Sequence, residues 1–478
     1  MKDRIFISTS IPYVNAAPHI GYALEAVQAD TIARWYRSTQ NDVFFLSGTD
    51  ENAIKNVESA EKKKISPQEL VDMFSKEFFK LKESLNLSFD EFIRTTSPKH
   101  KQGAQAFWEA CRKLHPDDIY SKEYKGLYCV GCETFYKDGE FPDNICPLHN
   151  RPLDEVVETN YFFALSKYAP ILKQKIESDE INVFPRFRKK ELLNMIEEGL
   201  EDFSVSRPVS RTKGWGIGVP GDDTQMIYVW YDALTNYITA LDYGTDGDLF
   251  HKYWLENKNR FHIIGKDIVK FHALYWPAML MSANVPLFTK LFVHGFITSE
   301  GQKISKSLGN VIDPFDLVNT YGADAVRYYL LKEIPSLDDG DYSHTRMHEI
   351  YNADLANELG NLVMRITTLA AKDEIVFNHN PEKTLVTSTL QEHIESYQFA
   401  AAVEEIWRHI KDLNKKINEF EPWSKSREDR KQFLTDALQN IYMIGHVLNP
   451  FMPHTGEKIT SSLSGKIAKM EPLFPRLK

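Results

Sequence analysis

Two short motifs in this chain carry groups that suit phosphate chemistry, and the first is Pro18-His19-Ile20-Gly21-Tyr22. It lies between an apolar run at 5–10 and a segment of helical character at 23–30, so we expect a strand, a turn and a helix. Proline is favoured at the first helical position, which predicts that the helix begins at Pro18. Such a helix end directs free N–H groups and positive dipole at a phosphate. His19 would add a donor, and Gly21 would let a flat purine approach the backbone.

The second motif is Lys303-Ile304-Ser305-Lys306-Ser307, and it is followed by a glycine turn. Its two ammonium groups lie three residues apart among hydroxyl groups, which is typical of a loop that closes on a triphosphate. Positive charge at a phosphorus that gathers negative charge in the transition state lowers the barrier directly. Taken alone, the segment is equally well explained as an exposed basic loop. The first motif in the same chain favours phosphate binding.

The hydrophobic pattern predicts four regions that position these motifs. Residues 1–115 and 225–345 have the alternating strand and helix pattern of an α/β protein, and we expect strands at 5–10, 43–46, 225–232, 261–267 and 290–295. Residues 116–224 predict an irregular insertion punctuated by proline and glycine, and residues 346–478 predict an all-α region. Side chains that do chemistry gather at the carboxyl ends of parallel strands, where His19, Asp50, Asp267 and Gly295 would lie.

Three of the four cysteines fall in one window with a histidine. Cys129 and Cys132 form one knuckle, and Cys146 and His149 form a second one after thirteen intervening residues. Two such knuckles close on one tetrahedral zinc ion through three thiolates and one imidazole. Four protein ligands leave no open position for water, so we expect one structural Zn²⁺. Unrelated reduced thiols are the alternative explanation.

Length, charge and apolar runs limit the remaining classes. A chain of 478 residues predicts two to four domains, and 42% hydrophobic residues suffice for ordinary globular cores. The net charge of −10 gives no global support for nucleic-acid binding, although basic clusters at 62–64 and 186–190 offer local contacts. The start of the chain lacks a signal-peptide pattern, and prolines and polar residues interrupt the longest apolar stretch, 271–288. We therefore predict a cytoplasmic protein with no membrane partner.

With these landmarks, the chain resembles the methionyl-tRNA synthetase family of class I aminoacyl-tRNA synthetases over essentially its whole length. The two motifs look like the ATP-handling signatures of that class. Ser47-Gly48-Thr49-Asp50-Glu51 looks like the segment whose acid holds the substrate ammonium, and segments 228–233 and 265–272 resemble two walls of the methionine pocket. The resemblance implies a Rossmann-like, doubly wound parallel-sheet catalytic domain in two halves (1–115 and 225–345), a zinc-binding connective insertion (116–224) and an anticodon-binding helix bundle (346–478).

The resemblance also implies residues for each substrate. Those for ATP are Pro18, His19, Gly21, Tyr22, Gly265, Asp267, His294, Gly295, Lys303, Ser305 and Lys306. Those for methionine are Ile11, Tyr13, Asp50, Trp230, Ala233, Tyr237, Ile268 and His272, with Asp50 on the amino group. Those for the anticodon are Asn357, Asn361, Arg365, Pro422 and Trp423. Within the ATP set, His19, Lys303 and Lys306 would act catalytically by stabilising the transition state.

The implied activity is a two-step ligation. The carboxylate of L-methionine attacks the α-phosphate of MgATP in line and gives methionyl-adenylate and pyrophosphate, and the terminal ribose hydroxyl of tRNA(Met) then takes the methionyl group. Substrate phosphates and water would hold most of the Mg²⁺ coordination sphere. A thioether packs well against aromatic edges, which suits Trp230, and Trp423 would stack on an unpaired anticodon base. Trp230 as an ordinary core aromatic, and Asn361 and Arg365 as partners within the bundle, are the alternatives.

Two departures from the family pattern bear on the adenylation rate. Tyr22 stands where the first signature usually ends in histidine, and Asn52-Ala53 replaces the common His-Gly. No appended tRNA-binding or dimerisation domain follows residue 478, which predicts a monomer with modest tRNA affinity.

Two other functions remain as alternatives. A cysteinyl-tRNA synthetase would place cysteine or histidine ligands where this chain has Trp230. A catalytically silent relative that binds RNA would explain Tyr22 and Asn52, but the intact loop at 303–307 argues against it. Synthetases for Ile, Leu and Val are a weaker alternative, because they normally need a large editing insertion and the metal window already takes the space between the two α/β halves.

Overall fold

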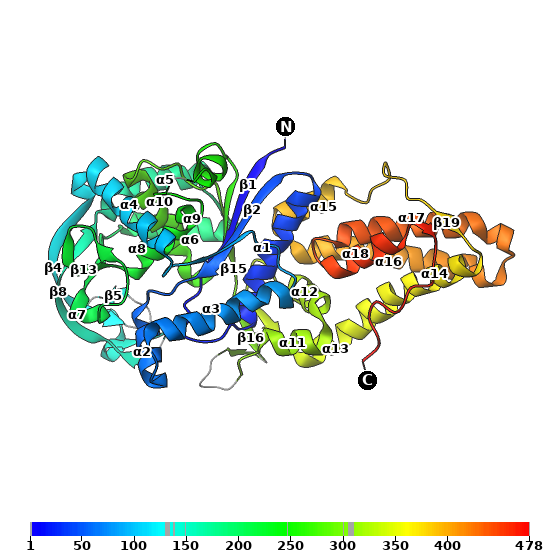
Figure 1. Cartoon of the computed structure of the whole chain (residues 1–478), viewed down its shortest axis with the longest axis horizontal. Helices are drawn as coiled ribbons and strands as arrows, with labels where there is room; N and C mark the ends of the chain where they lie inside the picture. Colours follow the sequence, from blue (N-terminus) through cyan, green and yellow to red (C-terminus); the bar gives the residue numbers. More distant parts are fainter. Residues whose placement is uncertain are drawn as a thin grey trace. The chain divides into compact units, whose positions relative to one another are not determined.

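The structure is a computed structural model, and it describes residues 2–129, 134–136, 139–148, 150–245, 247–299, 301–304 and 310–477. The chain divides into two compact units (Figure 1). The first consists of Met1–Pro18, Asn41–Lys80 and Phe89–Val293, and the second of His19–Gln40, Leu81–Ser88 and His294–Lys478. Within the described residues, no helix is long and apolar enough to cross a membrane.

The first unit contains a six-stranded sheet with the order β3-β2-β1-β14-β15-β9. The strands are β1 (Arg4–Thr9), β2 (Asp42–Thr49), β3 (Glu91–Arg94), β9 (Asn182–Phe184), β14 (Arg260–Gly265) and β15 (Lys290–His294). The pairs β1·β2, β1·β14, β2·β3 and β9·β15 are parallel. β1 and β14 are almost wholly buried, as expected for parallel strands covered on both faces. The predicted parallel sheet is therefore confirmed.

Helices connect these strands and follow them in the chain. They are α2 (Ile54–Lys63), α3 (Pro67–Ser84), α4 (Pro98–Leu114), α5 (Ala169–Glu177), α6 (Arg186–Glu198), α7 (Val209–Thr212), α8 (Val229–Leu234), α9 (Asn236–Thr239) and α10 (Trp276–Ser282). Two π-helical segments, His251–Leu255 and Phe271–Tyr275, complete the set in this unit.

The strand expected at 225–232 is wrong in its second half. The strand β13 (Asp222–Ile227) ends before Tyr228, and α8 follows directly. The Asp232 N–H donates to the Tyr228 carbonyl at 3.0 Å, which closes the first helical turn. A short apolar run has the same composition in a buried strand and in a buried helix, so the pattern alone does not separate them. Trp230, Ala233 and Tyr237 are spaced by three and four residues, which places them on one helical face.

The irregular structure expected for 116–224 is also wrong. Strands β4 (Ile119–Cys129) and β8 (Asp154–Phe163) pair along nearly their whole length in an antiparallel sheet of order β10-β8-β4-β5. The edge strands of this sheet are β5 (Thr134–Tyr136) and β10 (Phe203–Ser204). A second sheet pairs β11 (Ser206–Pro208) and β12 (Gly218–Val219) with β13. A third pairs β6 (Ile145–Cys146) with β7 (Arg151–Pro152). Along β8, Val156, Asn160 and Phe162 are buried while the intervening Glu155, Val157 and Thr159 are exposed, as expected for a sheet with one covered face.

The second unit is mainly helical. Its helices are α1 (Ile20–Ser38), α11 (Pro314–Tyr321), α12 (Ala323–Lys332), α13 (His344–Ile350), a π-helix (Tyr351–Gly360), α14 (Asn361–Lys372), α15 (Ser388–Glu395), α16 (Phe399–Phe420), α17 (Arg427–Leu448) and α18 (Pro453–Ser462). Figure 1 shows α16, α17 and α18 side by side. Short strands also occur: β16 (Ile297–Ser299), β17 (Gln302–Lys303), β18 (Gly340–Tyr342), β19 (Val376–Phe377) and β20 (Gly465–Lys466).

A buried ion pair ties α1 to α12 within this unit. The Arg327 guanidinium lies 2.7 Å from the Asp30 carboxylate, and both side chains have no exposed surface. Arg327 also donates to the carbonyls of Pro450 at 2.9 Å and Phe451 at 2.8 Å. Burial alone would raise the pKa of Asp30, but the charges of Arg327 and Arg34 outweigh it and hold the pKa below its ordinary value. The pair is stable because every polar group in it has a partner.

Replacing Arg327 with methionine should therefore destabilise the protein by about 3–5 kcal/mol, because it removes one of the two arginines beside the buried Asp30 carboxylate and leaves the carbonyl oxygens of Pro450 and Phe451 without their Arg327 donor. A carboxyl group whose pKa is lowered by folding stabilises the fold above its unfolded pKa, and this contribution is lost as the pH falls through the folded pKa. The gap in melting temperature between wild type and R327M should thus stay nearly constant from neutral pH to about pH 5 and narrow as the pH falls below about 4, the ordinary pKa of an aspartate. The matched control is R346M, which breaks an exposed pair with Glu333 and should cost at most about 1 kcal/mol.

Candidate active site

The ends of β1 and β2 bring Tyr13 and Asp50 together in the first unit. The two residues form an isolated parallel bridge, and the Asp50 N–H donates to the Pro12 carbonyl at 2.9 Å. Earlier in the same two strands, the hydroxyls of Thr9 and Ser47 are hydrogen-bonded at 2.9 Å. Asp50 is buried. The backbones of Tyr13 and Asp50 are thus fixed side by side at the edge of the sheet.

Trp230 lies between Tyr13 and the π-helical segment. Its ring meets the Tyr13 ring edge-on at 6.3 Å between centroids and stacks on Phe271 at 3.8 Å with an interplanar angle of 2°. It is also edge-on to His272 at 6.5 Å. The buried Trp230 Nε1 has no hydrogen-bond partner among the residues that the structure describes. Packing therefore fixes the orientation of this indole.

Tyr237 and His272 form the deepest part of this group, and both are almost fully buried. His272 Nδ1 lies 3.0 Å from the Ile268 carbonyl, which only accepts, so Nδ1 carries a proton. In the neutral ring, Nε2 is then the acceptor for the Tyr237 hydroxyl at 2.7 Å. The Tyr237 ring also lies 4.1 Å from the ring of His262. Burial, with the charges of His272 and Arg260, holds the pKa of His262 well below its ordinary value, so this interior suits an uncharged group.

The structure thus joins Asp50, Tyr13, Trp230, His272 and Tyr237 in one continuous chain of contacts. The other three residues expected around methionine lie in the same unit: Ala233 is buried on α8, and Ile11 and Ile268 are half-buried against the same core.

Two participants were missed by the sequence analysis. Phe271 forms the stack on Trp230 and had no signal beyond its place beside His272. Ala53 is buried in a small cluster with Tyr228 and Val229, against which Tyr13 and Trp230 pack. Ala53 replaces the family's usual glycine, and this difference in the sequence could have indicated that an additional methyl group packs here.

The helix of the first motif lies in the second unit and begins two residues later than expected. Helix α1 starts at Ile20, and His19 is its N-cap, because His19 Nδ1 accepts from the Gly21 N–H at 3.1 Å. The prediction of Pro18 as the first helical residue is wrong, since the imidazole cap displaces the helix start by two positions. Because Nδ1 accepts, the proton of a neutral His19 lies on Nε2, which can donate to a ligand. His19 is exposed, and Tyr22 is half-buried.

His294 and Gly295 follow β15 and are constrained by their own unit. His294 lies 2.7 Å from the Gly295 carbonyl through Nδ1 and 2.9 Å from the Glu25 carboxylate through Nε2. A Cβ on Gly295 would lie 2.1 Å from the Asp338 carbonyl oxygen, so the backbone approach itself requires glycine. Glu25, on α1, is a partner that the sequence analysis did not identify.

The other residues expected to bind ATP lie in both units. In the first unit, Pro18 is buried, Gly265 ends β14 and Asp267 is exposed on the turn Lys266–Ile268. In the second, Lys303 belongs to β17. Ser305 and Lys306 lie outside the described residues.

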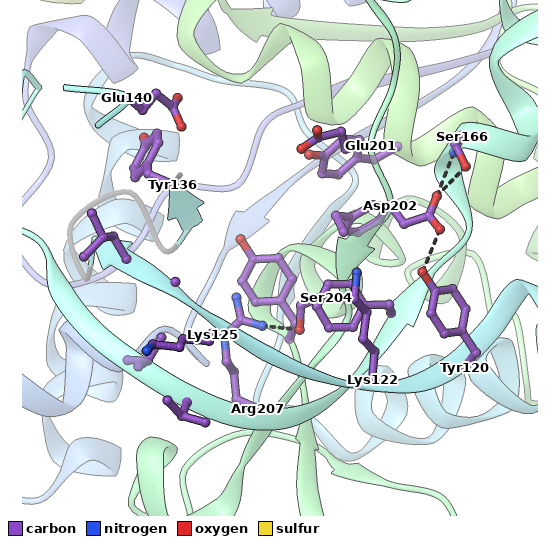
Figure 2. A pocket seen from close by; sticks show the side chains of 18 of the residues that line it. Tyr120, Lys122, Lys125, Tyr136, Glu140, Ser166, Glu201, Asp202, Ser204 and Arg207 are labelled. Atoms are coloured by element: carbon purple, nitrogen blue, oxygen red, sulfur yellow. Dashed lines mark hydrogen bonds between the residues drawn. The ribbon is translucent and has the colours of Figure 1, made fainter. Parts of the chain in front are cut away.

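The first unit also contains a large cavity of about 1080 Å³ on one face of β4 and β8 (Figure 2). Figure 2 shows the Asp202 carboxylate bonded to the Tyr120 hydroxyl, at 2.7 Å, and to Ser166. Burial, with the Asp202 carboxylate, raises the pKa of Tyr120 to about 12, so its hydroxyl remains a donor at neutral pH. The guanidinium of Arg207 lies 4.1 Å from the Tyr228 ring.

This cavity adjoins the methionine-site residues through two of its walls. Its lining includes Tyr228, which directly precedes α8, and Tyr275, whose ring lies 5.1 Å from Phe271. Tyr275 in turn stacks on Phe203 at 3.9 Å. The charged side chains around it are four cations and four carboxylates: Lys122, Lys125, Arg207, Lys270, Glu140, Glu155, Glu201 and Asp202. The cavity is therefore aromatic and polar, with no excess of either charge.

A second cavity, of about 600 Å³, lies in the second unit between the Asn357–Arg365 segment and α16. Asn357, Asn361 and Arg365 all line it, although Asn357 belongs to the π-helix. Arg365 donates to the Asn418 side chain at 3.1 Å, and its guanidinium lies 5.0 Å from the Trp423 ring. Trp423 is 49% exposed. The lining is rich in amide groups and also includes Lys411 and Lys415.

Hydrogen bonds from Arg430 stabilise the turn that carries Trp423. Arg430 donates to the carbonyls of Pro422 at 3.3 Å and Lys425 at 2.8 Å, and it pairs with Asp373 at 2.5 Å. The hydrogen bonds from Arg430 lower the pKa of Asp373. A buried anchor thus presents an exposed indole.

Two of the four expected zinc ligands are described. Cys129 ends β4 and Cys146 ends β6, and both thiols are buried in one small cluster with Leu127 and Leu153. Two buried thiols that share a small apolar cluster fit two ligands of one ion. Cys132 and His149 lie outside the described residues, and no group of three metal-ligating side chains occurs among the described ones.

The comparisons agree with this geometry. The family model "tRNA synthetases class I (M)" matches residues 5–152 and 150–367. A solved structure of Mycobacterium tuberculosis methionyl-tRNA synthetase in complex with methionyl-adenylate is similar, with a TM-score of 0.90, 34% identity and complete coverage of both chains. The Methionine--tRNA ligase of Thermotoga maritima is 40% identical over 96% of this chain and 75% of its own. That of Brucella suis is 38% identical over 97% of this chain and 92% of its own.

The parallel sheet, the capped signature helix and these matches make the chain a class I tRNA synthetase. Within that class, it belongs to the methionine–tRNA ligase family. The resemblance predicted from the sequence is confirmed.

Proposed function

We propose that this protein ligates L-methionine to tRNA(Met) by way of methionyl-adenylate. The observation that carries the proposal is the chain of contacts from Asp50 through Tyr13 and Trp230 to His272 and Tyr237. It offers one carboxylate for an ammonium group and, beyond it, aromatic edges around an uncharged interior. A zwitterionic amino acid with a polarizable, neutral side chain matches both ends.

In the first step, the bound methionine carboxylate attacks the α-phosphate of ATP. Asp50 holds the ammonium group, which keeps the carboxylate directed away from the pocket. His19 through its Nε2–H, with Lys303 and Lys306, neutralises the charge that develops on the phosphates. Phosphoryl and nucleotidyl transfers depend on positioning and electrostatics, so no covalent nucleophile is required. Mg²⁺ bound to the substrate phosphates would supply further neutralising charge.

Amino-acid-dependent ATP–pyrophosphate exchange, measured without tRNA across the twenty amino acids, tests this step. We expect exchange with methionine alone. Asp50→Asn should lower kcat/KM for methionine roughly ten- to a hundredfold, because the ammonium loses a charged partner worth about 1.5–3 kcal/mol. The control Glu61→Gln changes an exposed carboxylate paired with Lys213 and should leave exchange unchanged. Exchange with cysteine would support the cysteinyl alternative, and none at all the silent RNA-binding relative.

In the second step, the tRNA must contact both units. We propose that the cavity on β4 and β8 takes the unpaired acceptor end, since it adjoins the methionine residues through Tyr228 and Tyr275. Unpaired bases bind through stacking on aromatic rings and through cations that follow the backbone. The carboxylates of the lining suit the exocyclic amino groups of cytosine and adenine. The cavity lined by Asn357, Asn361 and Arg365, with Trp423 on its Pro422 turn, would read the anticodon bases.

Two short RNAs separate these assignments. Trp423→Ala should weaken binding of the tRNA(Met) anticodon stem-loop roughly tenfold to a hundredfold, because stacking contributes about 1–3 kcal/mol per base. The double variant K122A/K125A should slow methionine transfer to an acceptor minihelix. Each variant serves as the other's control, because neither change should affect the other RNA or ATP–pyrophosphate exchange. Equal loss with both RNAs in either variant would contradict the division.

We also propose that Cys129, Cys132, Cys146 and His149 hold one structural Zn²⁺. The two described thiols are buried together at the ends of β4 and β6, in a cluster with a small apolar core that a tetrahedral ion would reinforce. An ion with four protein ligands takes no part in the chemistry and stiffens the segment next to the acceptor-end cavity.

Cys146→Ser should therefore reduce the metal content from one zinc per chain to none, as measured by elemental analysis. Limited proteolysis between residues 116 and 165 should become faster, and aminoacylation should fall with it. Cys111→Ser is the control, because Cys111 is a buried thiol outside the window and should leave the zinc content unchanged. Full aminoacylation by a chain proven to lack zinc would rule out this role.

The four-domain division, the monomeric state and the cytoplasmic location stay predictions. The location follows from the proposed substrates, since charged tRNA is consumed by cytoplasmic ribosomes.

A further inference from the structure

Asn52, the residue that replaces the family's usual histidine, connects two segments that are far apart in the sequence. Its side-chain amide donates to the Asp232 carboxylate at 3.0 Å and to the Thr95 carbonyl at 3.2 Å. Its backbone N–H donates to the Asp50 carboxylate at 3.3 Å. Asn52 is buried, so these bonds are formed without competition from water.

Asp232 receives a second donor from the opposite side. His100 Nε2 lies 3.2 Å from the other Asp232 oxygen, and His100 Nδ1 lies 2.8 Å from the Thr239 hydroxyl. The side chains of His100 and Asp232 have no exposed surface. Burial raises the pKa of Asp232, while His100 and Asn52 oppose that rise. Each carboxylate oxygen therefore depends on one named donor, and losing one leaves a buried acceptor unpaired, at about 1–3 kcal/mol.

The Asn52–Asp232 hydrogen bond links the two parts of the proposed methionine site, the ammonium partner and the side-chain pocket. Asn52 is two residues from Asp50, the proposed ammonium partner. Asp232 is two residues from Trp230 and next to Ala233, on the short helix that forms the side-chain pocket. The Asn52–Asp232 bond directly joins segment 50–53 to α8. Ala53 supports it by packing in the cluster with Tyr228 and Val229.

We propose that Asn52 is a positioning residue that sets the distance between the Asp50 carboxylate and the Trp230 side of the methionine pocket. The inference rests on the proposed function. A substrate with an ammonium group at one end and a thioether at the other is selected by the separation of its two partners. Misplacement by about 1 Å costs as much as a hundredfold in rate, so this spacing determines which side-chain length is accepted. Asn52 thereby takes a structural role that needs no contact with ATP.

The test exchanges donor and acceptor within the pair. Asn52→Asp keeps the side-chain shape but sets two carboxylates against each other, and it should raise KM for methionine at least tenfold in ATP–pyrophosphate exchange. KM for ATP should stay within twofold. The preference for methionine over S-methylcysteine, which is one methylene shorter, should also fall. The double variant N52D/D232N restores the bond between the two side chains with the roles reversed. It should recover a large part of the lost KM and preference, while the Thr95 carbonyl still lacks the donor that Asn52 supplies. Asn52→His, the residue usual in the family, should retain them.

Asn257→Asp is the control for a purely structural effect. Asn257 is also buried and donates to two carbonyls, those of Tyr253 and Asn259, away from these residues. It should lower the melting temperature without changing the preference for methionine. If N52D fails to fold, KM for methionine and the preference over S-methylcysteine in the double variant and in N52H still test the inference.

An unchanged KM and preference in N52D, or no recovery in a folded double variant, would overturn the inference. A wild-type chain that does not activate methionine would instead refute the proposed function.

Discussion

The placement of β1 between β2 and β14 is the constraint on which the site depends. Parallel strands end at the same edge of a sheet, so the chain leaves this edge at Tyr13, at Asp50 and at Lys266 from three neighbouring positions. The hydroxyl pair of Thr9 and Ser47 fixes the first two strands in register just before they end. The residues proposed to bind the amino acid are thus placed by the central strands of the sheet.

Aromatic packing extends this constraint away from the sheet. Trp230 stacks on Phe271, Phe271 meets Tyr275, and Tyr275 stacks on Phe203 at the edge of the large cavity. Aromatic pairs of this kind prefer specific geometries and contribute about 0.5–1.5 kcal/mol each beyond area burial. A continuous row of ring contacts therefore joins the residues of the proposed methionine pocket to the wall of the cavity proposed for the acceptor end.

The sequence predicted the parts of this arrangement that follow from local composition. The strands of the parallel sheet have continuous apolar runs, which predict buried strands. The two motifs have the spacing of glycine and charged residues that is typical of phosphate binding. It did not predict that α8 is a helix, because a short run such as 228–233 has no distinguishing period. It placed the start of α1 at Pro18, because proline statistics do not include an imidazole cap from His19. The Asn52–Asp232 bond joins residues 180 positions apart, and no local pattern contains such a pair.

The departures at Tyr22 and Asn52 pointed toward a silent relative when only the sequence was considered. For Asn52, the contacts give a different reason for the change: a buried amide that donates to Asp232 and Thr95 stands where the family usually has an imidazole. The Asp232 carboxylate thus keeps a donor on each oxygen, Asn52 on one and His100 on the other. A buried carboxylate that lost one of these donors would destabilise the fold, so an alternative donor has been accommodated here without that cost. The change at position 52 therefore does not by itself indicate a lost amino-acid site.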